Sequence, residues 1–558
     1  MTESTRHSRD PGLSASPAGG QGVGPAVRDR EYECKLGGDA GQMQAARKAA
    51  QALSIRRLRW VRDDLENVYF DTPDLRLGGM RVSLRVRRKG TRFTQTVKSD
   101  NAGGGALFAR GEWEQAVDGM APRLDLLPEP ALDCLGLVLP GELRETIRTR
   151  FIRERATIVR QGPIGPEARI EIAFDTGEVT AGGQQGRSRA AARREAIREC
   201  ELELKQGDPR DLFEVALALQ QEAGLSVIRE SKAARGYRLM AAAPAAPCKA
   251  EPTALSAGGT VNDAIAAILR AGLGHMLANE APALEGRDPE GVHQFRVAVR
   301  RLRSVLTVFG RLLDPACVDW LKVELKWIAD QFGPARDWDV FAGEILHPVL
   351  NAGIEPAAMA ALAEAAEERR RLAYGPIRKA IASPRYGALV LKLSAFTETE
   401  GWSPQPCPAD HPLAEPVTDW APKLLARAYK KVIRAGDNLA ELDVPARHEV
   451  RIRLKRLRYA TDFLQSLYDG RAKARFLKAM ARLQDDFGHL NDVAVAQTLL
   501  ADLIARRLAA GDDAQHLHAA AAAVVAWHAR GLHDNEPRLL KDWQAFAEAR
   551  PFWRRQDG

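Results

Sequence analysis

The chain has 558 residues, of which 28% are charged and 45% hydrophobic, and its formal net charge is +8. This length exceeds what one hydrophobic core supports, so we expect about three mostly globular domains. The basic balance favours an acidic partner: nucleic acid, an anionic membrane surface or polyphosphate.

Cysteine usage and hydropathy indicate the compartment. The six cysteines are scattered with no Cys-x-x-Cys pair, which predicts neither a zinc framework nor a disulfide scaffold and fits a reducing cytoplasm. No apolar run reaches the length of a membrane span, so we expect no membrane partner. Residues 1–28 are rich in Ser, Gly, Pro and Ala and lack the apolar core of a signal peptide. They predict a disordered tail.

The first motif is Glu-Tyr-Glu-Cys-Lys-Leu at residues 31–36. Read as a strand, it places Glu31, Glu33 and Lys35 on one face and the three remaining side chains on the other. Such a face suits a polar cavity that holds a divalent cation and an anion, because Mg²⁺ and Mn²⁺ take oxygen ligands. A solvated edge strand with alternating charges is the alternative interpretation of an isolated match.

The same alternation recurs along the chain, after an Ala-rich helix predicted at 40–53. The later charged faces comprise Arg81, Ser83, Arg85 and Arg87; Thr94, Thr96 and Lys98; Glu112 and Glu114; Arg153 and Arg155; Glu171 and Asp175; and Glu199, Glu201, Glu203 and Lys205. If these faces point inward, the sheet must close around a polar interior, with helices over its apolar outside. Clustered acids and bases inside are costly unless metal and phosphate occupy them.

These segments resemble a known family. The blocks EYECK, YFDTPDLRL, LRVRR, TQTVK, RGEWE, IEIAFDTGE, ECELELKQGD and ESKAARGYRL occur in the order typical of the CYTH family, the triphosphate tunnel metalloenzymes. The resemblance implies that residues 29–240 form a closed antiparallel eight-stranded β tunnel with flanking helices, and that this tunnel binds triphosphate.

The resemblance also implies roles for individual residues. The expected catalytic residues are Glu31, Glu33, Lys35, Arg85, Arg87 and Lys98. The expected substrate-binding residues are Lys35, Arg85, Arg87, Lys98, Arg153, Lys205, Lys232 and Arg235. The expected ligands of Mg²⁺ or Mn²⁺ are Glu31, Glu33, Glu112, Glu114, Asp175, Glu201 and Glu203. Within the run Glu199, Glu201 and Glu203, any two of the three acids remain candidates.

The implied reaction is metal-assisted phosphoryl transfer to water. The chain lacks a Walker loop, since Gly103-Gly104-Gly105 is not followed by Lys-Ser/Thr, and it shows no nucleoside pocket motif. We therefore rank inorganic triphosphate ahead of thiamine triphosphate, and ATP cyclisation lower still.

The second half of the chain contains a repeat. Residues 241–258 form a Pro/Ala-rich linker, and long helical periodicity follows. The segment HQFRVAVRRLR matches HEVRIRLKRLR at a separation of 155 residues (448 − 293), and DQFGPARD matches DDFGHLND at the same separation (485 − 330). We predict a duplicated all-α domain at 259–510, with halves at about 259–400 and 415–510, followed by a helical extension at 511–558.

Each repeat carries basic residues on one helix face, given about 100° of rotation per residue. We expect these residues to bind polyphosphate: His293, Arg296, Arg300 and Arg303, and His448, Arg451, Lys455 and Arg458. An ordinary solvated helix face is the alternative. The blocks resemble the CHAD family, the conserved-histidine α-helical domain, over residues 259–504. That resemblance implies a bundle of two similar halves that binds inorganic polyphosphate.

The sequence thus predicts an α+β multidomain enzyme that hydrolyses inorganic triphosphate with a divalent metal and binds polyphosphate. It is expected in the cytoplasm, including at polyphosphate granules. The alternatives are a non-catalytic polyphosphate-granule protein and a thiamine triphosphatase. A nucleic-acid partner is disfavoured because Phe295 and Tyr459 are the few aromatics beside the basic faces.

Overall fold

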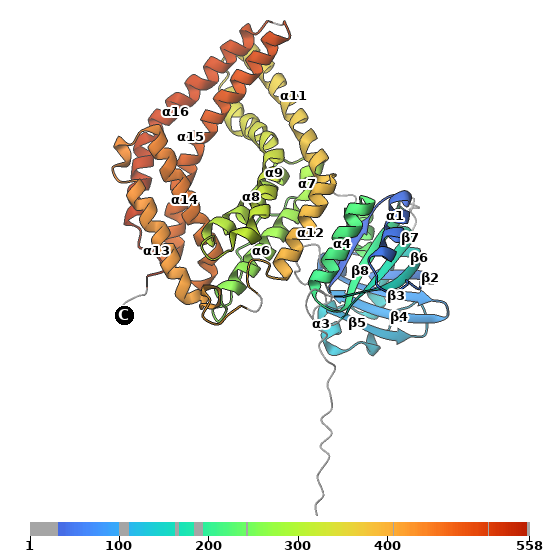
Figure 1. Cartoon of the computed structure of the whole chain (residues 1–558). Coiled ribbons are helices and arrows are strands. Elements are labelled where there is room, and N and C mark those ends of the chain that lie inside the picture. The colour runs from blue at the N-terminus through green and yellow to red at the C-terminus, as the bar shows by residue number, and fades with distance from the viewer. Residues whose placement is uncertain are drawn as a thin grey trace, which may run out of the picture.

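The computed structural model describes residues 32–99, 111–161, 167–182, 193–241, 244–404, 407–511 and 513–554. In this part of the chain, a β-sheet with flanking helices comes first and a larger all-helical region follows (Figure 1). The sheet-then-helix order therefore agrees with the prediction, while the exact domain limits stay a prediction.

Within the described residues, nine strands form one antiparallel sheet. The strands are β1 (Glu33–Gly37), β2 (Val61–Asp71), β3 (Val82–Lys89), β4 (Arg92–Ser99), β5 (Gly111–Val117), β6 (Arg144–Arg160), β7 (Ala168–Ala181), β8 (Arg193–Gln206) and β9 (Ser226–Val227). Their order across the sheet is β5-β4-β3-β2-β6-β7-β8-β1-β9.

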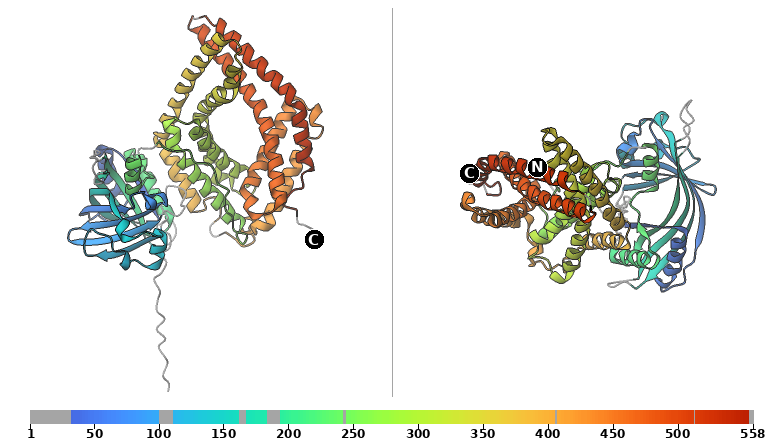
Figure 2. Two further views of the ribbon diagram at one scale, coloured as in Figure 1. Left: turned by 180° about the vertical axis from the view of Figure 1, so that it is seen from behind. Right: turned by 90° about the horizontal axis from the view of Figure 1, so that it is seen from above.

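The predicted closed, eight-stranded tunnel is wrong. The sheet has nine described strands, and its edge strands β5 and β9 do not pair with each other among the described residues. Strand β9 has only two residues, too few to continue the ladder. The chain then forms helix α5 (Lys232–Ala241), which packs on β6, β7 and β8. The sheet is instead an open, bent layer with a helix packed on part of one face (Figure 2).

The two faces of the sheet differ as the alternation predicts. Leu36, Ile172 and Leu202 lie on the face covered by α1 (Ala40–Ala52) and α4 (Pro209–Ala223) and are fully buried. Further along, the same face is covered by α2 (Arg76–Gly79) and α3 (Glu129–Leu135). Helices thus cover the apolar face, as predicted, and the charged residues two positions apart share the other.

The helical region begins after the predicted linker. Its α-helices are α6 (Val261–Ala278), α7 (Glu280–Glu285), α8 (Pro289–Val308), α9 (Pro315–Val340), α10 (His347–Asn351), α11 (Pro356–Ile381), α12 (Pro384–Glu398), α13 (Val417–Ala435), α14 (Val444–Leu464), α15 (Arg471–Ala509) and α16 (Gln515–Glu548). None of the helices in the described ranges is long and apolar enough to cross a membrane.

The repeat is visible in how its helices begin and pack. Helices α8 and α14 each start after an aspartate N-cap, Asp288 or Asp443, with a proline in the first turn. Helix α8 packs on α6 and α9, and α14 packs on α13 and α15. In the first half, Phe295 stacks on Phe332 at 3.9 Å between ring centroids. The predicted duplication is therefore confirmed.

The helical region also contacts the sheet region directly. Helix α12 packs against α4 and β9. The side-chain amide of Gln220, on α4, donates from Nε2 to the carbonyl oxygen of Pro384 at 2.9 Å. The two parts of the chain therefore share an interface that includes a buried polar contact.

Helix α5 approaches the sheet closely at Gly236, where an added Cβ would lie 2.5 Å from Cγ2 of Ile147 on β6. We predict that Gly236→Ala lowers the free energy of unfolding by about 1–3 kcal/mol, because the helix must move off the sheet. Gly79→Ala is the matched control, since nothing lies within 4 Å of an added Cβ there. Denaturant unfolding of both variants measures the effect, and equal stability of the two would contradict the prediction.

Candidate active site

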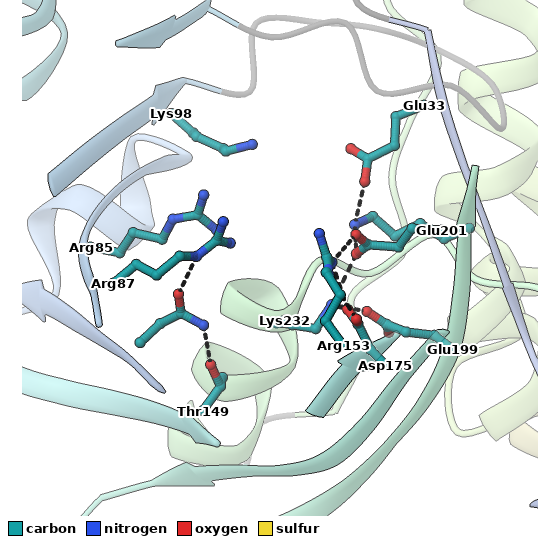
Figure 3. Close-up of polar contacts among 12 residues, drawn as sticks. Glu33, Arg85, Arg87, Lys98, Thr149, Arg153, Asp175, Glu199, Glu201 and Lys232 are labelled. Carbon is teal, nitrogen blue, oxygen red and sulfur yellow. Dashed lines mark hydrogen bonds and ion pairs between the residues drawn. The ribbon is translucent and has the colours of Figure 1, made fainter. Parts of the chain in front are cut away.

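Charged side chains from several strands and from α5 gather on the uncovered face of the sheet, which we call the trough (Figure 3). One side, the basic wall, consists of Arg85 and Arg87 on β3 and Lys98 on β4. The opposite side, the mixed wall, consists of Lys35, Arg153, Asp175, Glu199, Glu201, Lys232 and Arg235. Figure 3 shows side chains of the two walls pointing toward each other. Residues distant in sequence thus face one shared space.

Three carboxylates of the mixed wall are buried: Asp175, Glu199 and Glu201 expose 1%, 0% and 8% of their surface. Lys232, the first residue of α5, contacts all three, and its Nζ lies 2.7 Å from Oδ2 of Asp175 and 2.9 Å from Oε1 of Glu201. Arg153 donates from Nε and Nη2 to both oxygens of Asp175, at 2.8 and 2.7 Å. The carboxylates can be buried because cations are buried with them.

Electrostatic coupling keeps these groups ionised. Burial alone would lower the pKa of Lys35, but the carboxylates of Glu201 and Glu33 outweigh burial and raise that pKa. Burial alone would raise the pKa of Glu201, but Arg153, Lys232 and Lys35 hold that pKa well below its ordinary value. The mixed wall is therefore a set of mutually compensating charges near neutral pH.

The basic wall is less well compensated. Nζ of Lys98 lies 2.7 Å from Oε2 of Glu112, and Nη2 of Arg85 lies 3.7 Å from Oε1 of the same carboxylate. Arg87 forms no ion pair within the described part of the chain. Burial, followed by repulsion from Arg85 and Arg153, lowers the pKa of Arg87 to about 10. A bound anion would relieve this repulsion, so the wall suits phosphate oxygens.

A hydrogen-bonded pair behind Arg87 was missed by the sequence analysis. Nε of Arg87 donates to Oδ1 of Asn67 at 2.9 Å, and Nδ2 of Asn67 donates to Oγ1 of Thr149 at 2.7 Å. Asn67 is fully buried and orients the guanidinium. The available signal was the polar Asn67 two positions from Leu65 and Tyr69, on the same face of β2.

The buried acids form the most compact candidate metal centre in the described residues. Ligand atoms of Asp175, Glu199 and Glu201 lie within 4.8 Å of one another. Lys232 contacts all three, however, so a metal ion there would have to displace an ammonium group. This cluster alone therefore fits a divalent cation poorly.

A second set of acids fits better. Glu33 on β1 is directly opposite Glu203 on β8, and Glu203 is opposite Glu171 on β7. Their side chains expose 14%, 25% and 23% of their surface, so they remain accessible. Glu201 lies on the same face of β8. Carboxylate oxygens from neighbouring strands suit Mg²⁺ or Mn²⁺.

The other predicted site residues lie in different surroundings. Glu112 and Glu114, on edge strand β5, lie beside the basic wall; Glu114 accepts a hydrogen bond from Oγ1 of Thr96 at 3.2 Å. Lys205 pairs with Glu203 at the exposed end of β8. Glu31 lies outside the described residues. Glu199 lies in the mixed wall, so all three acids of the ambiguous run face the trough.

A separate basic surface lies in the helical region. It consists of two stripes: His293, Arg296, Arg300 and Arg303 on α8, and His448, Arg451, Lys455 and Arg458 on α14. The two helices contact each other, and Cζ of Arg300 lies 5.9 Å from the ring centroid of Tyr459 on α14. The stripes thus meet at Arg300.

The pKa values show that the stripes repel each other. Burial, then Arg451 and Arg300, lower the pKa of Lys455 to about 8. Burial, then Arg336, lower the pKa of His293 to about 4, so this imidazole is neutral at neutral pH. Crowded cations whose charged forms are destabilised favour an anionic partner and disfavour a metal ion.

Family models match both halves of the chain: the CYTH domain model matches residues 29–237, and the CHAD domain model matches residues 267–501. The chain therefore consists of a CYTH domain followed by a CHAD domain. The resemblances inferred from the sequence blocks are confirmed.

Individual relatives cover parts of the chain. An inorganic triphosphatase from Haemophilus influenzae is 29% identical over 180 residues, which are 31% of this chain and 46% of that protein, so the chain spans about half of the relative's length. The crystal structure of the CHAD domain from Ricinus communis is 28% identical, with a TM-score of 0.47, over 55% of this chain and 98% of that one. A Hippeastrum protein described as having a dominant triphosphatase activity is 16% identical, with a TM-score of 0.26, over 38% and 96%.

The mixed wall predicts a strong effect of removing its central cation. Lys232→Met leaves three buried carboxylates short of a cation, so we expect the free energy of unfolding to fall by about 3–5 kcal/mol. Lys205→Met, at an exposed ion pair, is expected to change it by less than about 1 kcal/mol. Denaturant unfolding at neutral pH measures both, and similar losses in the two variants would contradict the charge-balance account.

Proposed function

We propose that this protein hydrolyses inorganic triphosphate in the trough of its CYTH domain. The observation that carries the proposal is the basic wall, where the partly compensated guanidiniums of Arg85 and Arg87 face a wall of acids and bases. The inorganic triphosphatase relative supports the same substrate class. The proposal does not require a closed tunnel, because the open trough already presents charges from both sides.

In the proposed reaction, water adds to a terminal phosphorus as the bond to the bridging oxygen breaks, and a proton passes to solvent. The products are phosphate and pyrophosphate. Arg85, Arg87 and Lys98 bind the phosphate oxygens and offset the negative charge that builds up on them. Lys35 and Arg153 are placed to contact the substrate from the other side.

The proposed cofactor is Mg²⁺ or Mn²⁺, held by Glu33 and Glu203 with Glu201 beside them. Such an ion supplies Lewis-acid polarisation of phosphoryl oxygens and lowers the pKa of a bound water. Glu33 and Glu203 are directly opposite each other across β1 and β8, which places their oxygens on one side of the trough.

For the CHAD domain we propose binding of inorganic polyphosphate along the basic stripes of α8 and α14. Arginine and lysine side chains on two contacting helices can contact successive phosphates of one chain. The lowered pKa of Lys455 supports this, because a polyanion would restore the stability of its charged form.

One observation favours a second candidate function, a polyphosphate-binding protein without catalysis. Lys232 contacts the three acids that form the most compact candidate metal centre, and this arrangement would neutralise them permanently. The two functions differ in phosphate release. A screen of tripolyphosphate, thiamine triphosphate, nucleoside triphosphates and long polyphosphate, with Mg²⁺ or Mn²⁺, separates them.

We predict that Glu33→Gln lowers metal-dependent phosphate release from tripolyphosphate by at least about 100-fold, because it removes a proposed metal ligand. Glu178→Gln, which changes a carboxylate on the other face of β7, is the control and should keep wild-type rates. Full activity of Glu33→Gln would refute the proposed site. Binding of tripolyphosphate by wild-type protein without any phosphate release would favour the second candidate.

Polyphosphate binding should weaken at alkaline pH. The pKa of Lys455 is about 8, so its ammonium is charged below that pH and loses its proton as the pH rises through it. We expect the Kd for polyphosphate to rise up to about tenfold between roughly pH 7 and pH 9. Lys455→Arg should remove most of this rise, because a guanidinium stays charged. Filter binding at constant salt tests this, and an identical rise in both proteins would contradict it.

A further inference from the structure

A buried polar contact joins the CHAD domain to the segment that leads into α5. Glu280, the first residue of α7, forms an ion pair with Arg229 and accepts a hydrogen bond from the hydroxyl of Tyr386 on α12. Glu280 and Tyr386 expose 6% and 4% of their surface. Arg229 also donates to the carbonyl oxygen of Leu277 at the end of α6. One arginine of the CYTH domain is thus held by two helices of the CHAD domain.

Arg229 lies at a mechanically important place. It comes just after β9, where the backbone amide of Ile228 donates to the carbonyl oxygen of Lys35 at 2.8 Å. Three residues later, Lys232 begins α5 and contacts the buried carboxylates of the mixed wall. The segment from 228 to 232 therefore has one end on the sheet, the other in the site, and its middle held by the CHAD domain.

Helix α5 has few other means of fixing where it begins. Its first turn is capped by Ser231, whose hydroxyl accepts a hydrogen bond from the amide of Ala234 at 3.1 Å. Its second site residue, Arg235, pairs with Glu199. Both site cations of α5, Lys232 and Arg235, would move with this turn if the segment before it were released.

We infer that Glu280, a residue of the CHAD domain, is a positioning residue for the CYTH site: by holding Arg229 it fixes the start of α5 and hence the places of Lys232 and Arg235. Glu280 itself does not contact the trough and acts only through Arg229. The consequence for catalysis rests on the proposed function, whereas the consequence for α5 does not.

The interface also supplies a control of the same kind. Gln220 is buried, belongs to the CYTH domain and donates to Pro384 of the CHAD domain, but it lies on α4, on the covered side of the sheet. A change there weakens the interface without touching the segment before α5. Glu280→Gln keeps the shape of the side chain and removes its charge, so it isolates the ion pair with Arg229.

The test compares Glu280→Gln, Arg229→Gln, the double variant and Gln220→Ala in the full chain. We expect hydrogen–deuterium exchange to quicken in residues 228–241 of the first three, and exchange in α1 to stay unchanged. We expect their KM for tripolyphosphate to rise by about tenfold, with the double variant no worse than either single one, because both singles remove the same contact. Gln220→Ala should lower stability with little change in KM.

The outcomes are distinguishable. Unchanged exchange at 228–241 in folded Glu280→Gln overturns the positioning role, whatever the activity. Effects on KM that add in the double variant, or a similar KM for Gln220→Ala, also overturn it, since they indicate general loosening. If wild-type protein releases no phosphate but exchange still quickens, the proposed function fails and the positioning role stands. Should Glu280→Gln not fold, Arg229→Lys with the same exchange measurement decides.

Discussion

The arrangement of the CYTH domain depends on the contact between the ammonium of Lys232 and three buried carboxylates. Asp175, Glu199 and Glu201 could not stay ionised inside the protein without it, because an uncompensated buried charge costs several kcal/mol. The lysine comes from α5, not from the sheet, so the helix must dock before the charges balance. Docking in turn requires Gly236 against β6 and a fixed start at Arg229.

The same contact divides the trough into two electrostatic regions. On the mixed wall, acids and bases compensate each other and leave little charge for a ligand. On the basic wall, Arg87 has only the neutral Asn67 as a hydrogen-bonding partner among the described residues. The surplus of positive charge therefore lies on β3, where a polyanion gains most. The CHAD stripes follow the same principle, with crowded cations that a phosphate chain would separate.

Much of this could be predicted from the sequence. Alternation of charged and apolar residues correctly placed Lys35, Arg85 and Glu201 on one face of the sheet, because side chains two apart in a strand share a face. The fixed separation of the two histidine blocks correctly predicted a helical duplication. These features are local or periodic, and a single sequence displays them.

The failures concern contacts that no local pattern encodes. Closure of the sheet depended on whether β9 could extend, and a two-residue strand followed by α5 ended the ladder instead. Asn67 was missed because its role depends on the position of Arg87 on the neighbouring strand. The ion pair of Arg229 with Glu280 joins residues from different domains, and neither belongs to a motif.

The central claim is that the trough, through β3, binds a triphosphate chain. Calorimetric titration with a non-hydrolysable imido analogue of tripolyphosphate tests it directly on wild-type protein, Arg85→Gln with Arg87→Gln, and Arg88→Gln. Arg88 is adjacent on β3 but points to the opposite face, where it pairs with Glu66. The account predicts that the double variant weakens binding by at least about 100-fold and that Arg88→Gln stays within about twofold, since only the former loses charge-assisted hydrogen bonds to the ligand. Equal weakening by both, or no binding to the wild-type protein, would contradict it.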